Sequence, residues 1–502
     1  MASRNPETQS LEKLVAGQEI LFGGNRVACV SAALAEAFAA GDQIRVIERT
    51  GQLLHIPSHE ADIASAAVGR AVAAFRAMGE VADEQISRFY EEFALRLDSA
   101  EVWSEIARTN LEDVERAAAK GRSTTRLVAS DSLRRDMIDG LRGWISTGSR
   151  RGQVLERIEH EGWRAELLGS ELGVVAFIFE GRPNVLADAT GVLRGGNTVV
   201  FRIGSDALQT AQAMMRLALD PALQTAGLPA GAAVLVESTA HAAGWALFCD
   251  SRLSLAVARG SGDAVATLGA LAQQSGVPVS LHGTGGAWII ASDTTRPASL
   301  SRAVVASLDR KVCNTLNVLC LPRSRAGELV PAFLSALTEA GEVLGESWRL
   351  HVVEGDEGHV PAELFEESVS VTRAEGRVEE CRADSIPEAA LATEWEWEQT
   401  PEVSLKIVDD VDQAVDLCNR YSPQFIASLV SDNESEAERF YQRVNAPFVG
   451  DGHTRWVDGQ KALNRPELGL SNWQNGRLFG RGGVLSGDSV YSVRTRVTSD
   501  DR

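Results

Sequence analysis

The spacing of hydrophobic residues changes several times along this chain. Residues 42–57 alternate apolar and polar side chains around Thr50-Gly51, which predicts a β-hairpin. From about Ala61 to Trp144 apolar residues recur with helical spacing, which predicts several amphipathic helices. Residues 153–170 alternate again and predict a strand pair that projects between two helical regions.

Buried strands and helices then follow one another in a regular order. Residues 172–179 are a continuous apolar run, as buried parallel strands require. We expect further strands at 197–202, 233–236 and 253–258, with helices over 185–195, 206–219 and 241–248. A second series begins near residue 287 and runs past residue 430. This order predicts an α/β fold with two doubly wound domains, which bind ligands at the carboxyl ends of their strands.

Charge and composition narrow the class of partner. The 502 residues carry a net charge of −20, which argues against a nucleic acid, because such binding needs clustered Lys and Arg. No run approaches the length of a membrane span, and the N-terminus lacks the apolar core of a signal peptide. The six cysteines form no CxxC pair and no metal-type spacing with His, so we expect no metal, reduced thiols and a cytoplasmic location.

Polar motifs follow three of the expected strands. In Phe179-Glu-Gly-Arg-Pro-Asn184, the last residue either caps the next helix or donates its amide to an oxyanion. In Phe201-Arg-Ile-Gly-Ser-Asp206, Gly204 allows close approach of a ligand and Arg202 supplies a cation. Ser205 and Asp206 either meet ribose hydroxyls or cap the following helix. Ala258-Arg-Gly-Ser-Gly262 is a turn whose backbone N–H groups suit a phosphate.

A cysteine with polar neighbours stands before another buried strand. Cys313 follows Arg310 and Lys311, whose charges favour a thiolate, and thiolates are the nucleophilic form. Its local sequence is equally compatible with a structural cysteine. Cys320 lies inside the apolar run 316–321, and we expect it in the core.

Taken in order, these blocks resemble the γ-glutamyl phosphate reductase (glutamate-5-semialdehyde dehydrogenase) family of the aldehyde dehydrogenase superfamily. That family carries a strand followed by E-x-RPN, a strand ending in RGGSE, an RGG turn, a glycine block and CN[TA] before a strand. This chain has FEGRPN, FRIGSD, ARGSG, LHGTGG and CNT, followed later by SLKIVDDVDQAV and HTRWVDG. The resemblance covers residues 62–497, and it implies an aldehyde-dehydrogenase-like fold with a nicotinamide cofactor.

Residue roles follow from this resemblance. It implies that Cys313 is the catalytic thiol and Asn184 the oxyanion amide. The implied cofactor contacts are Arg202, Gly204, Ser205, Asp206, Gly260, Ser261 and Gly262. The implied substrate contacts are Asn314, Arg455 and Asp458. Two departures concern the substrate: ASLDRKVCN replaces KTQRPSxCN, and NWQNGRLFGRGGVL replaces TQKLHARGPMGL.

The resemblance also implies a reaction. We expect NADPH-dependent reduction of an acyl phosphate, γ-glutamyl phosphate or a related amino-acyl phosphate, to the semialdehyde through a thioester on Cys313, as in proline biosynthesis. The block Leu281-His-Gly-Thr-Gly-Gly286 lacks the glutamate that hydrolytic relatives use to activate water. His282 in it is either an acid–base group or structural. A reductase of a CoA or carrier-protein thioester, and a non-catalytic scaffold, are the alternatives.

We expect four segments in the chain. Residues 1–60 are an N-terminal extension, 61–285 a nucleotide-binding domain with the strand pair, 286–445 the catalytic thiol domain, and 446–502 a segment that returns to the cofactor domain. Ser489–Val497 alternates with no evident partner in its own domain. Because exposed edges are usually covered, this stretch and 153–170 predict a homodimer or tetramer. An amino-acid kinase is the expected source of the acyl phosphate.

Overall fold

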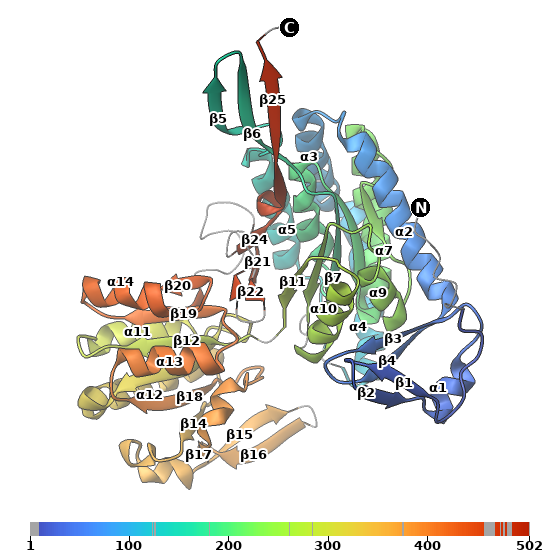
Figure 1. Ribbon diagram of the computed structural model, residues 1–502. Coiled ribbons are helices and arrows are strands. Elements are labelled where there is room, and N and C mark those ends of the chain that lie inside the picture. The colour runs from blue at the N-terminus through green and yellow to red at the C-terminus, as the bar shows by residue number, and fades with distance from the viewer. Residues whose placement is uncertain are drawn as a thin grey trace. The chain divides into compact units, whose positions relative to one another are not determined.

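The chain forms two compact units in a computed structural model. The structure describes residues 10–500 except 123, 125–126, 180, 261, 284, 374–375, 456–466, 472, 475–476 and 479–483. The first unit comprises Met1–Gly283, Arg465–Leu468 and Leu485–Arg502, and the second comprises Thr284–Asn464 and Gly469–Val484 (Figure 1). None of the described helices is long and apolar enough to cross a membrane.

The first unit begins with two small antiparallel hairpins. Strands β1 (Glu19–Phe22) and β2 (Arg26–Cys29) form one, and β3 (Gln43–Ile47) and β4 (Gln52–Ile56) form the predicted one, with helix α1 (Ala32–Ala37) between them. Gly51 adopts a φ of +79°, and a side chain there would also meet the Phe22 ring. Ile47 and Leu54 of the second hairpin pack with Leu271 in one apolar cluster.

Four long helices follow, as the helical spacing predicts. They are α2 (Ser58–Met78), α3 (Asp83–Asp98), α4 (Ala100–Ala119) and α5 (Asp131–Ser146). Ser99 caps α4 and Ser130 caps α5 by accepting main-chain N–H groups of the first turn. The phenol of Tyr90 in α3 donates to the carbonyl of Thr190, so this helix layer is joined to the segment that follows the first sheet strand.

The first parallel sheet has five strands in the order β11-β10-β7-β8-β9. Their bounds are β7 (Val174–Phe179), β8 (Thr198–Ile203), β9 (Ala233–Leu235), β10 (Leu255–Arg259) and β11 (Val279–His282). The connecting helices are α6 (Val185–Ala189), α7 (Leu208–Met214), α8 (Asp220–Ala226), α9 (His241–Phe248) and α10 (Gly262–Gln274). Every residue of β7 and β8 is buried, which explains their continuous apolar sequence.

A three-stranded antiparallel sheet completes the first unit and corrects one prediction. Its order is β25-β6-β5, with β5 (Val154–His160), β6 (Trp163–Glu171) and β25 (Tyr491–Ser499). The expectation that 489–497 lacks a partner in its own domain is wrong, since β25 pairs with β6 over its whole length. Glu166 of β6 holds the three strands together, accepting Arg157 at 2.7 Å and Arg496 at 2.6 Å.

The second unit is built on a seven-stranded parallel sheet in the order β17-β14-β18-β13-β12-β19-β20. The strands are β12 (Ala287–Ala291), β13 (Leu316–Pro322), β14 (Arg349–Val353), β17 (Ala383–Ile386), β18 (Glu402–Val408), β19 (Ile426–Val430) and β20 (Phe448–Gly450). Its helices are α11 (Pro297–Ala306), α12 (Ala326–Leu344), α13 (Val411–Tyr421) and α14 (Glu434–Arg443). Two doubly wound sheets therefore form the fold, and the predicted fold class is confirmed.

Three short strand pairs remain among the described residues. In the second unit β15 (Ser368–Arg373) pairs with β16 (Gly376–Cys381). Near the C-terminus β22 (Trp473–Gln474) pairs with β23 (Arg477–Leu478), and β21 (Glu467–Ser471) pairs with β24 (Val484–Ser486).

Candidate active site

Cys313 lies in a tight turn between α11 and β13 of the second unit. The Thr315 hydroxyl donates to the carbonyl of Arg310 at 2.6 Å and accepts the main-chain N–H of Val312 at 2.9 Å. The N–H of Gly286 donates to the carbonyl of Cys313 at 2.8 Å. The cysteine side chain is partly buried and packs on the apolar cluster that contains Phe425. The thiol therefore sits in a turn that is tied at both ends.

Gly285 and Gly286 of the predicted glycine block lie directly beside this turn. A Cβ atom at Gly285 would come within 2.6 Å of the Cα of Cys313, so no larger residue fits there without moving the turn. Gly286 adopts a φ of +103° and a side chain there would press on Asn317. Close approach of two backbones explains why the block requires glycines at these positions.

Glu394 reaches the same turn, and no local sequence pattern predicted it. Its Oε1 accepts Lys311 Nζ at 2.7 Å, and its Oε2 accepts the main-chain N–H of Gly285 at 2.5 Å. The side chain of Lys311 is only 4% exposed. Lys311, expected to act as a positive charge beside the thiol, is thus paired with a carboxylate, which offsets its charge.

Two of the predicted substrate residues meet on the other side of the turn. The guanidinium of Arg455 donates to the side-chain oxygen of Asn314 and, at 2.6 Å, to Asp309. Thr454 reinforces this contact, because its hydroxyl donates to the carbonyl of Asn314 at 2.7 Å. Arg455 is buried, so its position is fixed by these partners. The third predicted residue, Asp458, lies outside the described residues.

Cys320 differs from Cys313 in its surroundings. It is fully buried in β13, within the cluster that contains Trp288 and Val318. Burial raises the pKa of the Cys320 thiol well above its usual range, so this cysteine remains protonated.

Asn184 is the N-cap residue of α6 in the first unit, in the connection that follows β7. Its side-chain amide donates to the carboxylate of Asp188 at 2.7 Å. Burial raises the pKa of Asp188 to about 6, against the opposing charges of Arg259 and Arg182. The Asn184 side chain does not cap the helix, so of its two predicted roles the oxyanion donor is the one that the geometry still allows.

The predicted cofactor residues at the end of β8 have partners inside the protein. Arg202 is buried, and its Nη2 donates to the main-chain carbonyls of Thr239 and Ala240 at 3.3 and 3.1 Å. Burial lowers the pKa of Arg202, while the nearby Glu60 opposes that shift. Asp206 accepts Arg122 Nη1 with both oxygens at 2.6 Å. Arg122 is a second cation at this strand end that the sequence did not indicate.

The N-terminus of helix α10 could hold a phosphate. It starts at Gly262, three residues after the end of β10, and its N–H groups point toward its N-terminal end. Gly260 donates its N–H to the carbonyl of His282 at 3.3 Å, which fixes the turn. Gly204 and Ser205 form the corresponding turn after β8. Ser261 lies outside the described residues.

The ends of β8 and β10 could accommodate a dinucleotide, with Arg202 and Arg122 as the nearby cations. Among the described residues no group of three acidic, His or Cys side chains could hold a metal ion.

The aldehyde dehydrogenase family model matches residues 38–343, and the chain belongs to this family. Among curated relatives, the γ-glutamyl phosphate reductase of Afipia carboxidovorans is 30% identical over 402 residues, 77% of this chain and 84% of its own. The enzyme of the same name from Rhizobium etli is 27% identical, covering 86% of this chain and 94% of its own. The resemblance predicted from the motif blocks is confirmed.

Solved structures share the fold. The γ-glutamyl phosphate reductase of Thermotoga maritima superposes with a TM-score of 0.73 at 21% identity, covering 88% of this chain and 99% of that chain. An engineered glycolyl-CoA reductase with bound NADP⁺ has a TM-score of 0.58 at 14% identity, covering 87% of this chain and 96% of that chain. Members of the family use nicotinamide cofactors.

Proposed function

We propose that this protein reduces an acyl phosphate, γ-glutamyl phosphate or a related amino-acyl phosphate, to the semialdehyde with NADPH. The observation that carries the proposal is the Cys313 turn, tied at both ends and backed by Glu394 and Arg455. The names of the relatives at up to 30% identity support the same reaction.

The thiolate of Cys313 attacks the acyl carbon, and the electron pair of the carbonyl moves to its oxygen. The Asn184 amide and the main-chain N–H of Cys313 stabilise this oxyanion, which is worth about 10²–10³ in rate for each donor. The oxyanion collapses, the bond to phosphate breaks, and a thioester remains on Cys313. A bound nicotinamide would supply the hydride that reduces this thioester. The thiohemiacetal oxyanion so formed re-forms its carbonyl, expels the Cys313 thiolate and yields the aldehyde.

A reductase must keep water from hydrolysing the thioester before hydride transfer, and the surroundings of Cys313 are compatible with this requirement. Glu394 is a carboxylate beside the thiol turn, and both of its oxygens accept hydrogen bonds, from Lys311 and from Gly285. Because both oxygens are engaged in this way, neither is free to accept a proton from an attacking water. The thioester would then last long enough for hydride transfer.

In the proposed function NADP binds to the first unit. Gly260, Gly262 and the N-terminus of α10 would hold the pyrophosphate, and Arg202 with Arg122 would favour the charge of a 2′-phosphate. Asp206 would repel that phosphate if it stood alone, but its pairing with Arg122 reduces the repulsion.

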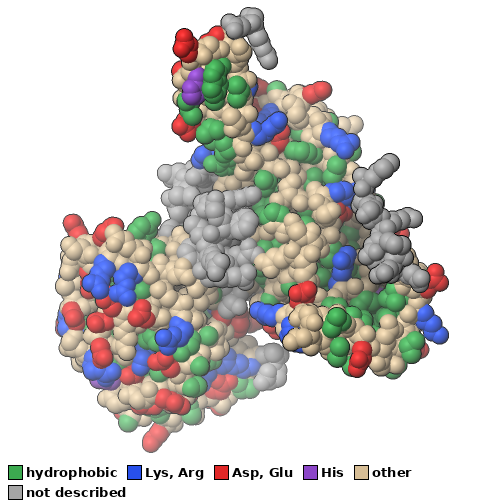
Figure 2. Space-filling model, in the orientation of Figure 1, with side chains coloured by type: hydrophobic (Ala, Val, Ile, Leu, Met, Phe, Trp, Pro, Cys, Tyr) green, Lys and Arg blue, Asp and Glu red, His purple; other side chains and the backbone are tan. Residues whose placement is uncertain are grey.

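The assembly we propose is a homodimer or tetramer in the cytoplasm, supplied with acyl phosphate by an amino-acid kinase. Hydrophobic side chains gather on the face of β5 and β6 in Figure 2. Large apolar side chains of the sheet that are at least 39% exposed are Val154, Leu155, Ile158, Trp163, Val493 and Val497. Such a patch marks a protein interface.

The test is the reverse reaction. Glutamate 5-semialdehyde and related amino-aldehydes are offered with NADP or NAD, and reduced cofactor is followed with and without inorganic phosphate. Phosphate-dependent oxidation with NADP, absent in Cys313→Ala, is the expected result. Oxidation that requires CoA in place of phosphate, or oxidation with neither, contradicts the proposal.

A further inference from the structure

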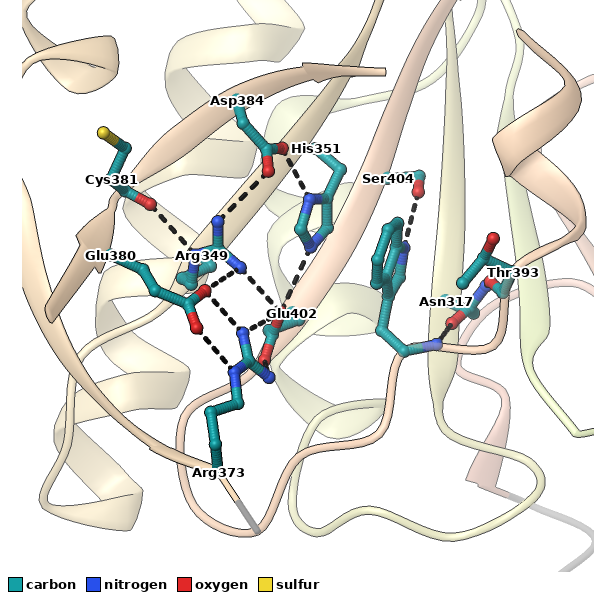
Figure 3. Close-up of polar contacts among 11 residues, drawn as sticks. Asn317, Arg349, His351, Arg373, Glu380, Cys381, Asp384, Thr393, Glu402 and Ser404 are labelled. Carbon is teal, nitrogen blue, oxygen red and sulfur yellow. Dashed lines mark hydrogen bonds and ion pairs between the residues drawn. The ribbon is translucent and has the colours of Figure 1, made fainter. Parts of the chain in front are cut away.

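A closed group of charged side chains surrounds His351 in the second unit (Figure 3). The members come from five strands, β14 to β18, and are three bases and three acids. They are Arg349, His351, Arg373, Glu380, Asp384 and Glu402. Arg349 and Arg373 both pair with Glu380 and Glu402, at 2.6 to 3.2 Å. The group is buried except at its Asp384, Glu380 and Arg373 edge.

The two ring nitrogens of His351 both face carboxylates. Nδ1 lies 2.6 Å from Asp384 Oδ1, and Nε2 lies 3.2 Å from Glu402 Oε2. Ionised carboxylates only accept, so both nitrogens must carry a hydrogen, and the ring is an imidazolium. Burial disfavours this charge, but the bonds to Asp384 and Glu402 outweigh it and raise the pKa of His351. The charged ring also balances the group at three positive and three negative charges.

The imidazolium lies flat against an indole. The rings of His351 and Trp395 are stacked at 17° with centroids 3.6 Å apart. A cation over an indole face is the strongest of the cation–π pairs in proteins. The indole N–H donates to the hydroxyl of Ser404 at 2.8 Å, so Trp395 is held by its face and by its edge.

The main chain around Trp395 is tied to the strand that follows Cys313. Asn317 of β13 accepts the N–H of Trp395 at 3.0 Å and donates to the carbonyl of Thr393 at 2.8 Å (Figure 3). Glu394 lies between these two anchors. Its carboxylate binds Lys311 and Gly285, which adjoin the thiol turn.

We propose that His351 is a positioning residue for the Cys313 thiol, acting through Trp395 and Glu394. The imidazolium fixes the indole of Trp395, and the indole together with Asn317 fixes residues 393–395. Glu394 then holds Lys311 and Gly285 in place at the Cys313 turn. The proposal rests on the proposed function only in taking Cys313 as the nucleophile. Loss of the imidazolium loosens Glu394 and exposes the thiol turn.

The rate at which iodoacetamide alkylates Cys313 measures the exposure of the thiol turn, and it needs no substrate. The rate is followed by mass spectrometry on the peptide with Cys313, so that the exposed Cys29 and Cys381 do not contribute. In His351→Gln we expect the alkylation rate to rise about threefold or more, because coupling through packed side chains typically has an effect of this size. The ratio of the His351→Gln rate to the wild-type rate should fall toward one at alkaline pH, because wild-type His351 then loses its proton as well.

Matched variants separate positioning from general destabilisation. Trp395→Leu removes the stacked ring while all charges stay, and it should raise the rate as His351→Gln does. Trp395→Phe keeps a ring against His351 and should restore a rate near wild type. Lys406→Met removes another buried cation of the same sheet, paired with Asp356 at 2.7 Å, and should lower the melting temperature without changing the rate.

Unchanged alkylation in both His351→Gln and Trp395→Leu overturns the proposal, and so does an equal increase in Lys406→Met. If His351→Gln does not fold, Trp395→Leu decides the matter. Turnover is recorded separately, and kcat should fall in the two variants while KM changes little. If the alkylation rate changes as expected but the wild-type protein turns over no acyl phosphate, the positioning role of His351 stands and the proposed function is wrong.

Discussion

The side-chain amide of Asn184 donates to the carboxylate of Asp188, one turn further along α6, at 2.7 Å. An amide nitrogen carries two hydrogens, and in the proposed mechanism the second would meet the developing oxyanion. Asp188 would then set the direction of the amide before substrate arrives. Preorganisation of this kind is what makes a donor effective in a transition state.

Asn184→Ala should lower kcat by about 10²–10³ with a modest change in KM, because the donor acts mainly in the transition state. Steady-state kinetics with the acyl phosphate, together with a melting curve, makes the measurement. A purely structural Asn184 would give the opposite pattern, a reduced melting temperature with a near-normal kcat.

Asp188 should make stability depend on mildly acidic pH. Its pKa is raised from 3.8 to about 6 in the folded protein, so between these pH values the folded state keeps a proton that the unfolded state has lost. The free energy of unfolding should therefore fall by about 3 kcal/mol in total as pH rises from about 3 to about 7, and stay level above that. Urea unfolding of wild type and Asp188→Asn across this range measures it. Identical pH profiles for the two proteins would contradict the assignment.

Cys313→Ala should abolish turnover and leave binding of the cofactor intact, because the thiol forms the intermediate and the nucleotide turns belong to the first unit. Cys320→Ala is the matched control. It should retain turnover and lose about 1–2 kcal/mol of stability, since it leaves a small cavity in a buried strand. Turnover by Cys313→Ala above a few per cent of wild type is incompatible with the mechanism.

Cofactor preference should depend on two arginines. We expect a higher kcat/KM for NADP than for NAD, and Arg202→Ala should reduce that ratio. Arg122→Ala should reduce it as well, because Asp206 then loses its partner and repels a 2′-phosphate. Arg122→Ala combined with Asp206→Ala should recover part of the ratio. Equal kcat/KM values for both cofactors in wild type would refute the preference.

Deletion of residues 488–502 should dissociate the oligomer and reduce solubility. The deletion uncovers the edge of β6 and leaves Glu166 without one of its two arginines. Light scattering and a solubility assay make the test. Glu166→Gln is a milder variant that keeps the strand and weakens only its ion pairs. A monomeric wild-type protein at micromolar concentration would contradict the oligomer.

Local sequence predicted the parts whose residues are close in the chain. The hairpin around Thr50-Gly51, the long helices before residue 146 and the buried strands were readable because their spacing is set by nearest neighbours. Glu394 was not, because its partners Lys311 and Gly285 are about 80 and 110 residues away. The partner of β25 was missed for the same reason, as pairing of distant strands leaves no local pattern.

The position of β25 has a consequence for synthesis of the protein. The buried amide of Asn197 donates to the carbonyl of Val490 at 2.8 Å, across a separation of 293 residues. During translation the whole second unit therefore emerges from the ribosome before the first unit can bury that amide or pair β6 with β25. Contacts of such long range form late and slowly. Until then the nascent first unit presents the unpaired edge of β6, which can pair with another chain.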